Sequence, residues 1–180
     1  MAQAVGRQMA AQGEGGSIIQ TSSTYGLVGP DFRIYEGSKY LGHQITTPCF
    51  YAASKAAVIG LTRYLATYWA KQGIRVNTLV PGGVESGQNE QFQKLYGERT
   101  PLERMAHVDE IVGTVVYLAS DASSYMTGQM MVVDGGWTAW EADCKTALFR
   151  LSAQYLFLLT FRPLSSVHYP YVTNFNLAEP

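Results

Sequence analysis

Tyr51 and Lys55 stand four residues apart in the segment YAASKAAVIGLTRYLA. Side chains at this spacing lie on the same face of an α-helix, so the phenol and the ammonium could point into one cleft. A free tyrosine has a pKa of about 10, and lowering it to about 7 requires roughly 4 kcal/mol. An ammonium about 5 Å away, at an effective dielectric constant of about 20, supplies roughly 3 kcal/mol of this. The pair is therefore predicted to be an acid–base catalyst for a carbonyl or an alcohol.

This prediction requires a helix to carry the pair. Apolar side chains recur at helical spacing downstream of Tyr51, without proline, at Val58, Leu61, Leu65 and Tyr68. Gly73 is a typical helix-terminating residue. Tyr35 and Lys39 have the same spacing but lie among glycines and threonines without an apolar period, which predicts a loop. The alternative is that Tyr51 only packs at the start of a helix while Lys55 extends into solvent.

Two short runs are predicted to be buried parallel strands. Residues 16–23, GSIIQTSS, are rich in β-branched residues and end in hydroxyls, and residues 74–80, IRVNTLV, precede a Pro-Gly-Gly turn. Open α/β sheets bind ligands in the crevice at the carboxyl ends of their strands. Ser23 is therefore predicted to lie in that crevice.

These segments, in this order, resemble the C-terminal part of a classical short-chain dehydrogenase/reductase. The matching segments, within residues 1–140, are GSIIQTSSTYG, YAASKAAVIGLTRYLA, IRVNTLVPGGVESG and PLERMAHVDEIVGTVVYLASDASSYMTGQMMVVDGGW. The resemblance implies an α/β fold with a Rossmann-like doubly wound parallel sheet, of which only the C-terminal half, the last three strands and their helices, would be present. Residues 1–140 would form this partial domain, and residues 141–180 match nothing in the family.

The resemblance also implies roles for individual residues. Tyr51 would donate or accept the substrate proton, and Lys55 would assist it and hydrogen-bond the nicotinamide ribose. Ser23, followed by Gly26, would orient the substrate oxygen, whereas Ser22 would face the packed side of the strand. Hydride would move between NAD or NADP and the substrate carbon.

The turn after the second strand resembles the family's loop for the nicotinamide carboxamide. Pro81 and Gly82 match its Pro-Gly pair, backbone groups near Val84 would contact the carboxamide, and Ser86 would supply a hydroxyl where the family more often has threonine. An ordinary strand-to-helix turn is the alternative. Asn77 is interpreted as structural.

Tyr51 follows Ser23 by 51 − 23 = 28 positions, more than in ordinary members of this family. Long structured loops often form lids or binding surfaces. Arg33 and Tyr35, with Glu36 and His43, could hydrogen-bond a polar, sugar-like substrate at the border of the cleft. The alternative is a surface loop that makes subunit contacts.

No G-x-G-x-x-G phosphate loop is present, and the family's first strands and its catalytic asparagine have no counterpart. We expect the chain to be a fragment without dehydrogenase activity of its own. The competing hypotheses are a non-catalytic subunit partner and a module that binds small polar ligands. The residue that distinguishes NAD from NADP lies about twenty positions beyond the phosphate loop, so the sequence leaves this choice open.

Residues 141–180 are interpreted either as a read-through or frameshifted tail or as a helix that covers a neighbouring subunit. The apolar run 147–161 within them is too short to span a membrane.

Composition narrows the remaining possibilities. A net charge of −1 without a basic run argues against nucleic acid as the main partner, and two scattered cysteines argue against a disulfide framework or a metal site. No signal peptide is visible, so a cytoplasmic protein is expected. The resemblance implies a homo-oligomer in which the alanine-rich helix face 52–57 approaches a partner copy.

Overall fold

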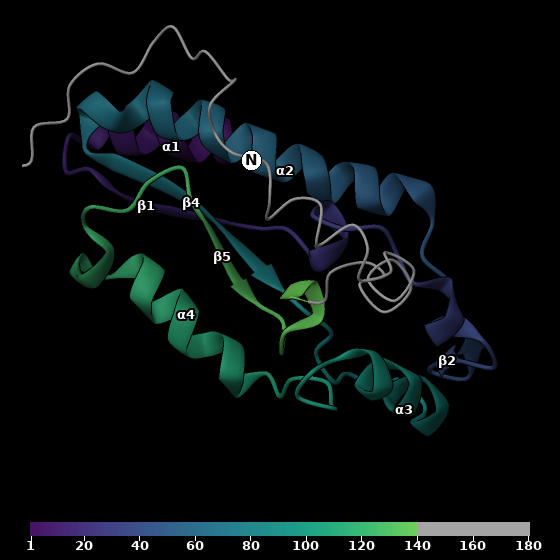
Figure 1. Cartoon of the computed structure of the whole chain (residues 1–180). Coiled ribbons are helices and arrows are strands. Elements are labelled where there is room, and N and C mark those ends of the chain that lie inside the picture. The colour runs from purple at the N-terminus through teal and green to yellow at the C-terminus, as the bar shows by residue number, and fades with distance from the viewer. Residues whose placement is uncertain (140–180) are drawn as a thin grey trace, which may run out of the picture. The chain divides into compact units, whose positions relative to one another are not determined.

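Three parallel strands in the order β1-β4-β5 form the main sheet of the computed structural model, which describes residues 1–139 (Figure 1). The strands are β1 (Gly16–Thr21), β4 (Ile74–Pro81) and β5 (Met130–Val133). Gly16 is paired with Ile74 and Thr78 with Met130, so β4 is central. Because β4 is covered on both faces, its side chains are mostly buried, as predicted for a buried parallel strand.

Helices lie on both faces of this sheet, with α1 and α2 on one and α4 on the other (Figure 1). The helices are α1 (Ala2–Gln12), α2 (Cys49–Trp69), α3 (Glu90–Arg99) and α4 (Asp109–Ala119). Short 3₁₀ turns are η1 (Thr24–Gly26), η2 (Phe32–Tyr35), η3 (Ala70–Gln72), η4 (Asp121–Ser123) and η5 (Trp137–Ala139), and a small hairpin pairs β2 (Lys39–Tyr40) with β3 (His43–Gln44). The predicted α/β, Rossmann-like parallel sheet is confirmed. The expectations for residues 141–180 lie outside the described residues.

The helix predicted downstream of Tyr51 is confirmed as α2. After η3, the chain leaves the helical conformation at Gly73, whose φ of 70° is left-handed. The predicted apolar stripe was only partly right, because Leu61 and Tyr68 are exposed. The stripe that faces the sheet is instead Ile59, Thr62, Leu65, Ala66 and Trp69. Leu65, Ala66 and Trp69 pack with Ile18, Ile74 and Val76 in the first core cluster.

Asn77 ties β4 to the loop before β5, in agreement with its structural interpretation. Its side chain is fully buried and donates to the carbonyl of Met126 at 2.8 Å, while it accepts from the amide of Gln129 at 3.0 Å. A buried amide with both ends satisfied stabilises the loop and has no polar group left for a ligand.

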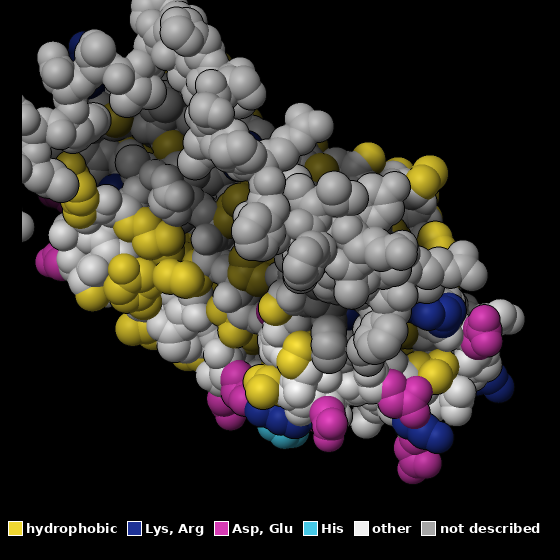
Figure 2. Space-filling view, viewed as in Figure 1, with side chains coloured by type: hydrophobic (Ala, Val, Ile, Leu, Met, Phe, Trp, Pro, Cys, Tyr) yellow, Lys and Arg dark blue, Asp and Glu magenta, His cyan; other side chains and the backbone are white. Residues whose placement is uncertain are grey.

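Exposed hydrophobic side chains gather over α4 (Figure 2). They are Val108, Val112, Val115, Val116 and Tyr117. A contiguous apolar patch of this kind is typical of a surface that contacts another protein. Among the helices that the structure describes, none is long and apolar enough to cross a membrane.

The end of β1 approaches α2 so closely that only glycine fits at residue 26. A Cβ atom at Gly26 would lie 2.8 Å from the carbonyl carbon of Lys55 and 2.7 Å from Ser22 Oγ. The backbone of α2 cannot move away without disturbing its packing on the sheet.

We therefore expect Gly26→Ala to lower the free energy of unfolding by roughly 1–3 kcal/mol, because the added methyl group overpacks a backbone contact. Urea unfolding of this chain measures the effect. Gly60→Ala in α2 is the matched control, since a Cβ there meets nothing within 4 Å. The control should be neutral or stabilising by up to about 1 kcal/mol. Equal stability of the two variants would contradict the packing argument.

Candidate active site

Ser23 and Tyr51 line the same cavity, which has a volume of about 300 Å³. Ser23 follows β1, and Tyr51 lies in the first turn of α2. Gly82 and Gly83, from the turn after β4, line the cavity as well. The cavity thus lies at the carboxyl ends of two adjacent parallel strands, where α/β sheets bind their ligands. Its volume is at the lower end of the range for small-molecule sites, about 300–1,000 Å³.

Lys55 lies beside Tyr51, as their spacing predicted. The Lys55 Nζ atom is 5.6 Å from the centroid of the Tyr51 ring, and it donates to the carbonyl of Thr21 at 3.2 Å. Thr21 is the last residue of β1, so the strand end holds the ammonium on the side of the helix that carries Tyr51. The ammonium therefore lies next to the Tyr51 ring, although only Tyr51 of the pair is a lining residue of the cavity.

The two neighbouring serines have different environments. Ser22 is buried, and its hydroxyl donates to the carbonyl of Lys55 at 2.7 Å. Ser23 Oγ accepts a hydrogen bond from the amide of Tyr25 at 3.3 Å and borders the cavity. This bond uses a lone pair of Ser23 and leaves the hydroxyl proton for another acceptor. The predicted division of roles between the two serines agrees with this arrangement.

The turn after β4 is held in one conformation by backbone hydrogen bonds. Gly82 donates to the carbonyl of Val133 at 2.9 Å, and Gly83 donates to the Tyr96 hydroxyl. Val84 forms an isolated parallel bridge with Ala106. Pro81, the residue before the turn, is the last residue of β4. The loop is therefore shaped before any ligand binds.

A side-chain carboxamide already contacts the groups that the resemblance assigned to the nicotinamide carboxamide. Gln88 Nε2 donates to the carbonyl of Val84 at 3.1 Å and to Ser86 Oγ at 3.3 Å. Gln88 Oε1 accepts from the amide of Ser86 at 2.8 Å. The nicotinamide ring carries the same functional group, so the donors and acceptors of this loop fit it. The sequence analysis missed Gln88, because no motif marks a residue that folds back onto its own loop.

The long segment between Ser23 and Tyr51 borders the cavity, as expected, through Tyr35, Thr46 and Thr47. It is anchored to the rest of the molecule at several points. Ile34 is buried in the second core cluster, which consists of Ile34, Phe92, Tyr96, Met105 and Trp137. The amide of Lys39 donates to the Asn89 side chain at 2.9 Å, and residues 40 and 88 form an antiparallel bridge. This segment is a fixed wall of the cavity.

Arg33 does not line the cavity, contrary to its expected position at the border of the cleft. Its side chain is 82% exposed and forms a two-point contact with Asp31, with Nη2 and Oδ2 2.6 Å apart. The hydrogen bonds from Arg33 hold the pKa of the Asp31 carboxyl below its usual value. Glu36 and His43 are exposed as well. Because η2 turns Ile34 and Tyr35 inward, neighbouring Arg33 faces outward.

Tyr35 and Lys39 do not share a helix, as the loop prediction required. Tyr35 ends η2, whereas Lys39 begins the small hairpin. Within residues 1–139, no three His, Cys, Asp or Glu side chains are grouped as metal ligands.

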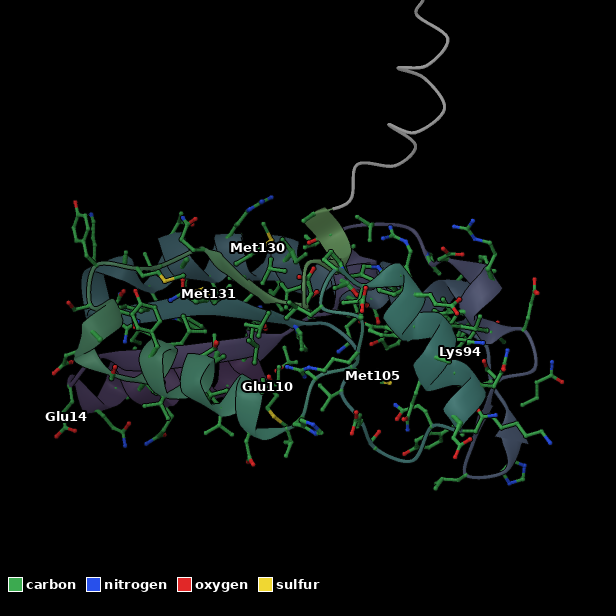
Figure 3. The ribbon with its side chains drawn as sticks, turned by 60° about the horizontal axis from the view of Figure 1, so that its bottom comes forward. Glu14, Lys94, Met105, Glu110, Met130 and Met131 are labelled. Atoms are coloured by element: carbon green, nitrogen blue, oxygen red, sulfur yellow. The ribbon has the colours of Figure 1, made fainter. Side chains whose placement is uncertain are left out.

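Two tyrosines that no sequence motif marked, the buried Tyr96 and the half-buried Tyr25, also line the cavity. Burial raises the pKa of Tyr96 to about 12. Burial and the hydrogen bond with Tyr35 raise the pKa of Tyr25 above its ordinary value. Both phenols therefore stay neutral at physiological pH. Met105 also lines the cavity. It lies between α3 and α4, on which Figure 3 labels Lys94 and Glu110. The position of Tyr25, two residues after Ser23, was the available signal.

Comparisons with known proteins agree with this architecture. A family model described as enoyl-(acyl carrier protein) reductase matches residues 1–138. The D-arabinitol 2-dehydrogenase (ribulose-forming) of Scheffersomyces stipitis is 48% identical over 101 residues, covering 51% of this chain and 36% of the relative.

Two solved structures have similar folds. The short-chain dehydrogenase of Leptospira borgpetersenii with bound NAD⁺ is 39% identical with a TM-score of 0.69, covering 76% of this chain and 50% of that one. The gluconate 5-dehydrogenase of Burkholderia cenocepacia in complex with NADP and tartrate is 35% identical with a TM-score of 0.64. The match covers 78% of this chain and 51% of that one. The chain therefore spans about half the length of these dehydrogenases. The family match over residues 1–138, together with the sheet and cavity described above, shows that the chain belongs to the short-chain dehydrogenase/reductase family.

Proposed function

We propose that this chain carries the substrate-binding and proton-transfer part of an NAD(P)-dependent oxidoreductase that interconverts an alcohol and a carbonyl. The observation that carries the proposal is the shared cavity of Ser23 and Tyr51, with the Lys55 ammonium beside the Tyr51 ring. Each group has a task in this chemistry. Tyr51 exchanges a proton with the substrate oxygen, Ser23 donates a hydrogen bond to that oxygen, and Lys55 places a positive charge next to the phenol.

Lys55 is well suited to this task because the chain holds it without neutralising it. Its ammonium donates to a neutral carbonyl, that of Thr21, and none of the ion pairs among residues 1–139 involves it. A positive charge that is not paired with a carboxylate retains its full effect on a neighbouring phenol. The same ammonium could also reach the ribose of a bound dinucleotide.

The cofactor, NAD or NADP, would supply or accept the hydride. The backbone of Pro81, Gly82 and Val84 and the hydroxyl of Ser86 would hold its carboxamide. The contacts of Gln88 with this loop support the assignment, because they match the donors and acceptors of a primary carboxamide. The bound NAD⁺ and NADP of the two solved relatives support a nicotinamide cofactor of either kind.

The substrate is proposed to be a small polar, sugar-like alcohol or its carbonyl form. The relatives that are named dehydrogenases of D-arabinitol and of gluconate support this class. Tyr35 is the residue of the long segment that could contact such a substrate, since it lines the cavity whereas Arg33 does not.

Residues 1–140 are proposed to form the carboxyl-terminal half of the family's domain and residues 141–180 a separate tail. The family match, which ends at residue 138, supports the boundary, and the half-length coverage supports a partial domain without indicating which half. The exposed apolar surface of α4 supports an oligomer of the full protein. The alternative function is that of a partner subunit or ligand-binding chain without turnover, which the half-length coverage also favours.

Tyr51→Phe removes the hydroxyl that exchanges the proton but keeps the ring. In a protein that combines this chain with any residues encoded upstream of it, kcat should fall by about 10²–10⁴, the range for loss of a general acid–base group. Spectrophotometric NAD(P)H turnover measures this. Tyr125→Phe, at a fully exposed tyrosine, is the control and should leave kcat unchanged. A Tyr51→Phe protein with the parental kcat would refute the assignment.

The purified 180-residue chain alone should show no NADH or NADPH turnover above that of its Tyr51→Phe variant. The reason is that no glycine-rich phosphate loop lies in the sequence to bind the dinucleotide. Measurable turnover by this chain that Tyr51→Phe abolishes would disprove the expectation and still support the assignment of Tyr51.

Gln88→Ala should tighten NADH binding in the extended protein by about fivefold, which corresponds to the roughly 1 kcal/mol of one net hydrogen bond. The wild-type side chain must leave Val84 and Ser86 before the nicotinamide can use them. Titration of NADH fluorescence gives Kd. Gln72→Ala, in an exposed 3₁₀ turn, is the control and should not change it. Weaker binding by Gln88→Ala would show that Gln88 helps to hold the cofactor.

A further inference from the structure

The polar side chains that line the cavity carry no formal charge. Apart from the Gln88 amide, they are hydroxyls contributed by serine, threonine and tyrosine. A carboxylate that leaves water requires a cation or several N–H donors to replace its hydration. A neutral hydroxyl requires only one acceptor and one donor. The chemistry of the lining therefore distinguishes between these two kinds of substrate group.

Arg33, Arg99 and Arg104 do not line the cavity, and each is engaged elsewhere. Arg33 contacts Asp31, and Arg99 lies 3.7 Å from the same carboxylate while its guanidinium stacks 5.0 Å from the centre of the Trp137 ring. Arg104 forms two short hydrogen bonds with Glu110. A substrate carboxylate would have to break one of these contacts to gain a guanidinium partner.

The hydroxyls of Tyr25, Tyr35 and Thr47, all from the long segment between Ser23 and Tyr51, form a hydrogen-bonded chain along the cavity wall. Tyr35 Oη donates to Tyr25 Oη at 3.2 Å and is also hydrogen-bonded to Thr47 Oγ1. Three hydroxyl groups carry three protons, and two internal bonds use only two of them. One proton and several lone pairs are therefore available to a ligand.

Packing holds these hydroxyls in place. The Tyr35 ring lies 5.8 Å from that of Phe92, and the Tyr25 ring contacts Trp137 edge to face at 6.3 Å. Burial raises the pKa of Tyr25, so its proton stays on the phenol and remains a donor. Fixed donors and acceptors lose little entropy when a ligand binds, which favours affinity and selectivity.

We propose that the Tyr25–Tyr35–Thr47 hydroxyl chain makes this site selective for a neutral polyol or its ketose over the corresponding sugar acid. The inference rests on the proposed function and deepens it by naming the substrate class. The hydroxyl chain contacts a substrate hydroxyl beyond the reacting carbon, donating one hydrogen bond to it and accepting another from it. The carboxylate of a sugar acid has no proton to donate to the lone pairs of these three hydroxyls. It also finds no cation among the described lining residues.

D-Arabinitol and D-arabinonate test the proposal, since they differ only in a terminal CH₂OH or COO⁻ group. Saturation-transfer NMR on the 180-residue chain and on the upstream-extended protein measures binding of each. Arabinitol should bind at least tenfold more tightly, and Tyr35→Phe, which keeps the ring, should reduce this preference by a factor on the order of ten. Tyr125→Phe should leave the preference unchanged. Circular dichroism melts verify that both variants are folded.

Thr46→Lys adds the missing cation at an exposed lining residue. It should increase the affinity for arabinonate and leave that for arabinitol within about twofold. This gain does not depend on the folding of the Tyr35→Phe variant.

The proposal is overturned if wild-type protein binds arabinonate as well as arabinitol, if it binds neither, or if Tyr35→Phe leaves the preference intact. The proposed function fails separately. If no alcohol supports Tyr51-dependent turnover while the Tyr35-dependent preference for arabinitol persists, the chain selects polyols without being a dehydrogenase. Tyr51-dependent turnover that prefers the acid would instead refute only the selectivity.

Discussion

The contact between the end of β1 and the middle of α2 determines the geometry of the whole site. Ser22 donates to the carbonyl of Lys55, and the Lys55 ammonium donates back to the carbonyl of Thr21. Gly26 lets the two backbones approach until a Cβ atom would no longer fit. These reciprocal bonds fix the rotation of α2 relative to the strand. Because Ser23 and Tyr51 are attached to these two elements, they come to face the same cavity.

A second constraint comes from the long segment that precedes α2. It does not lie loosely on the surface, because Ile34 is buried in the cluster around Trp137 and the Lys39 backbone is bonded to Asn89. Its tyrosine and threonine hydroxyls are held against aromatic rings. The same packing that stabilises the segment therefore orients the groups that face the ligand, so that stability and selectivity have one physical origin.

The site combines one positively charged side chain with several neutral ones. Lys55 is a charged group that donates to a neutral carbonyl, whereas the phenols of Tyr25 and Tyr96 are kept neutral by burial. Nearby arginines are paired with Asp31 and Glu110 and do not reach the cavity lining. Positive charge is thus present beside Tyr51, where proton exchange would need it, and absent from the wall that would bind the remainder of a substrate.

Local patterns along the chain determined much of this architecture. The periodicity after Tyr51 predicted α2, the β-branched runs predicted β1 and β4, and the Tyr51–Lys55 spacing predicted their neighbouring positions. These features depend on residues close in sequence, whose relative geometry a helix or strand dictates. The exposed positions of Leu61 and Tyr68 show the limit of such patterns, because the sheet decides which face of a helix is buried.

Only the tertiary structure decided which residues of the long segment reach the cavity. Arg33 and Tyr35 were equivalent candidates by composition, yet a 3₁₀ turn directs one to solvent and the other inward. Gln88 and Tyr25 gained their positions from contacts that no motif encodes. Tyr25 contacts Trp137, which is far away in the sequence and is brought near by packing of the whole domain, whereas Gln88 folds back onto Val84 and Ser86 of its own loop.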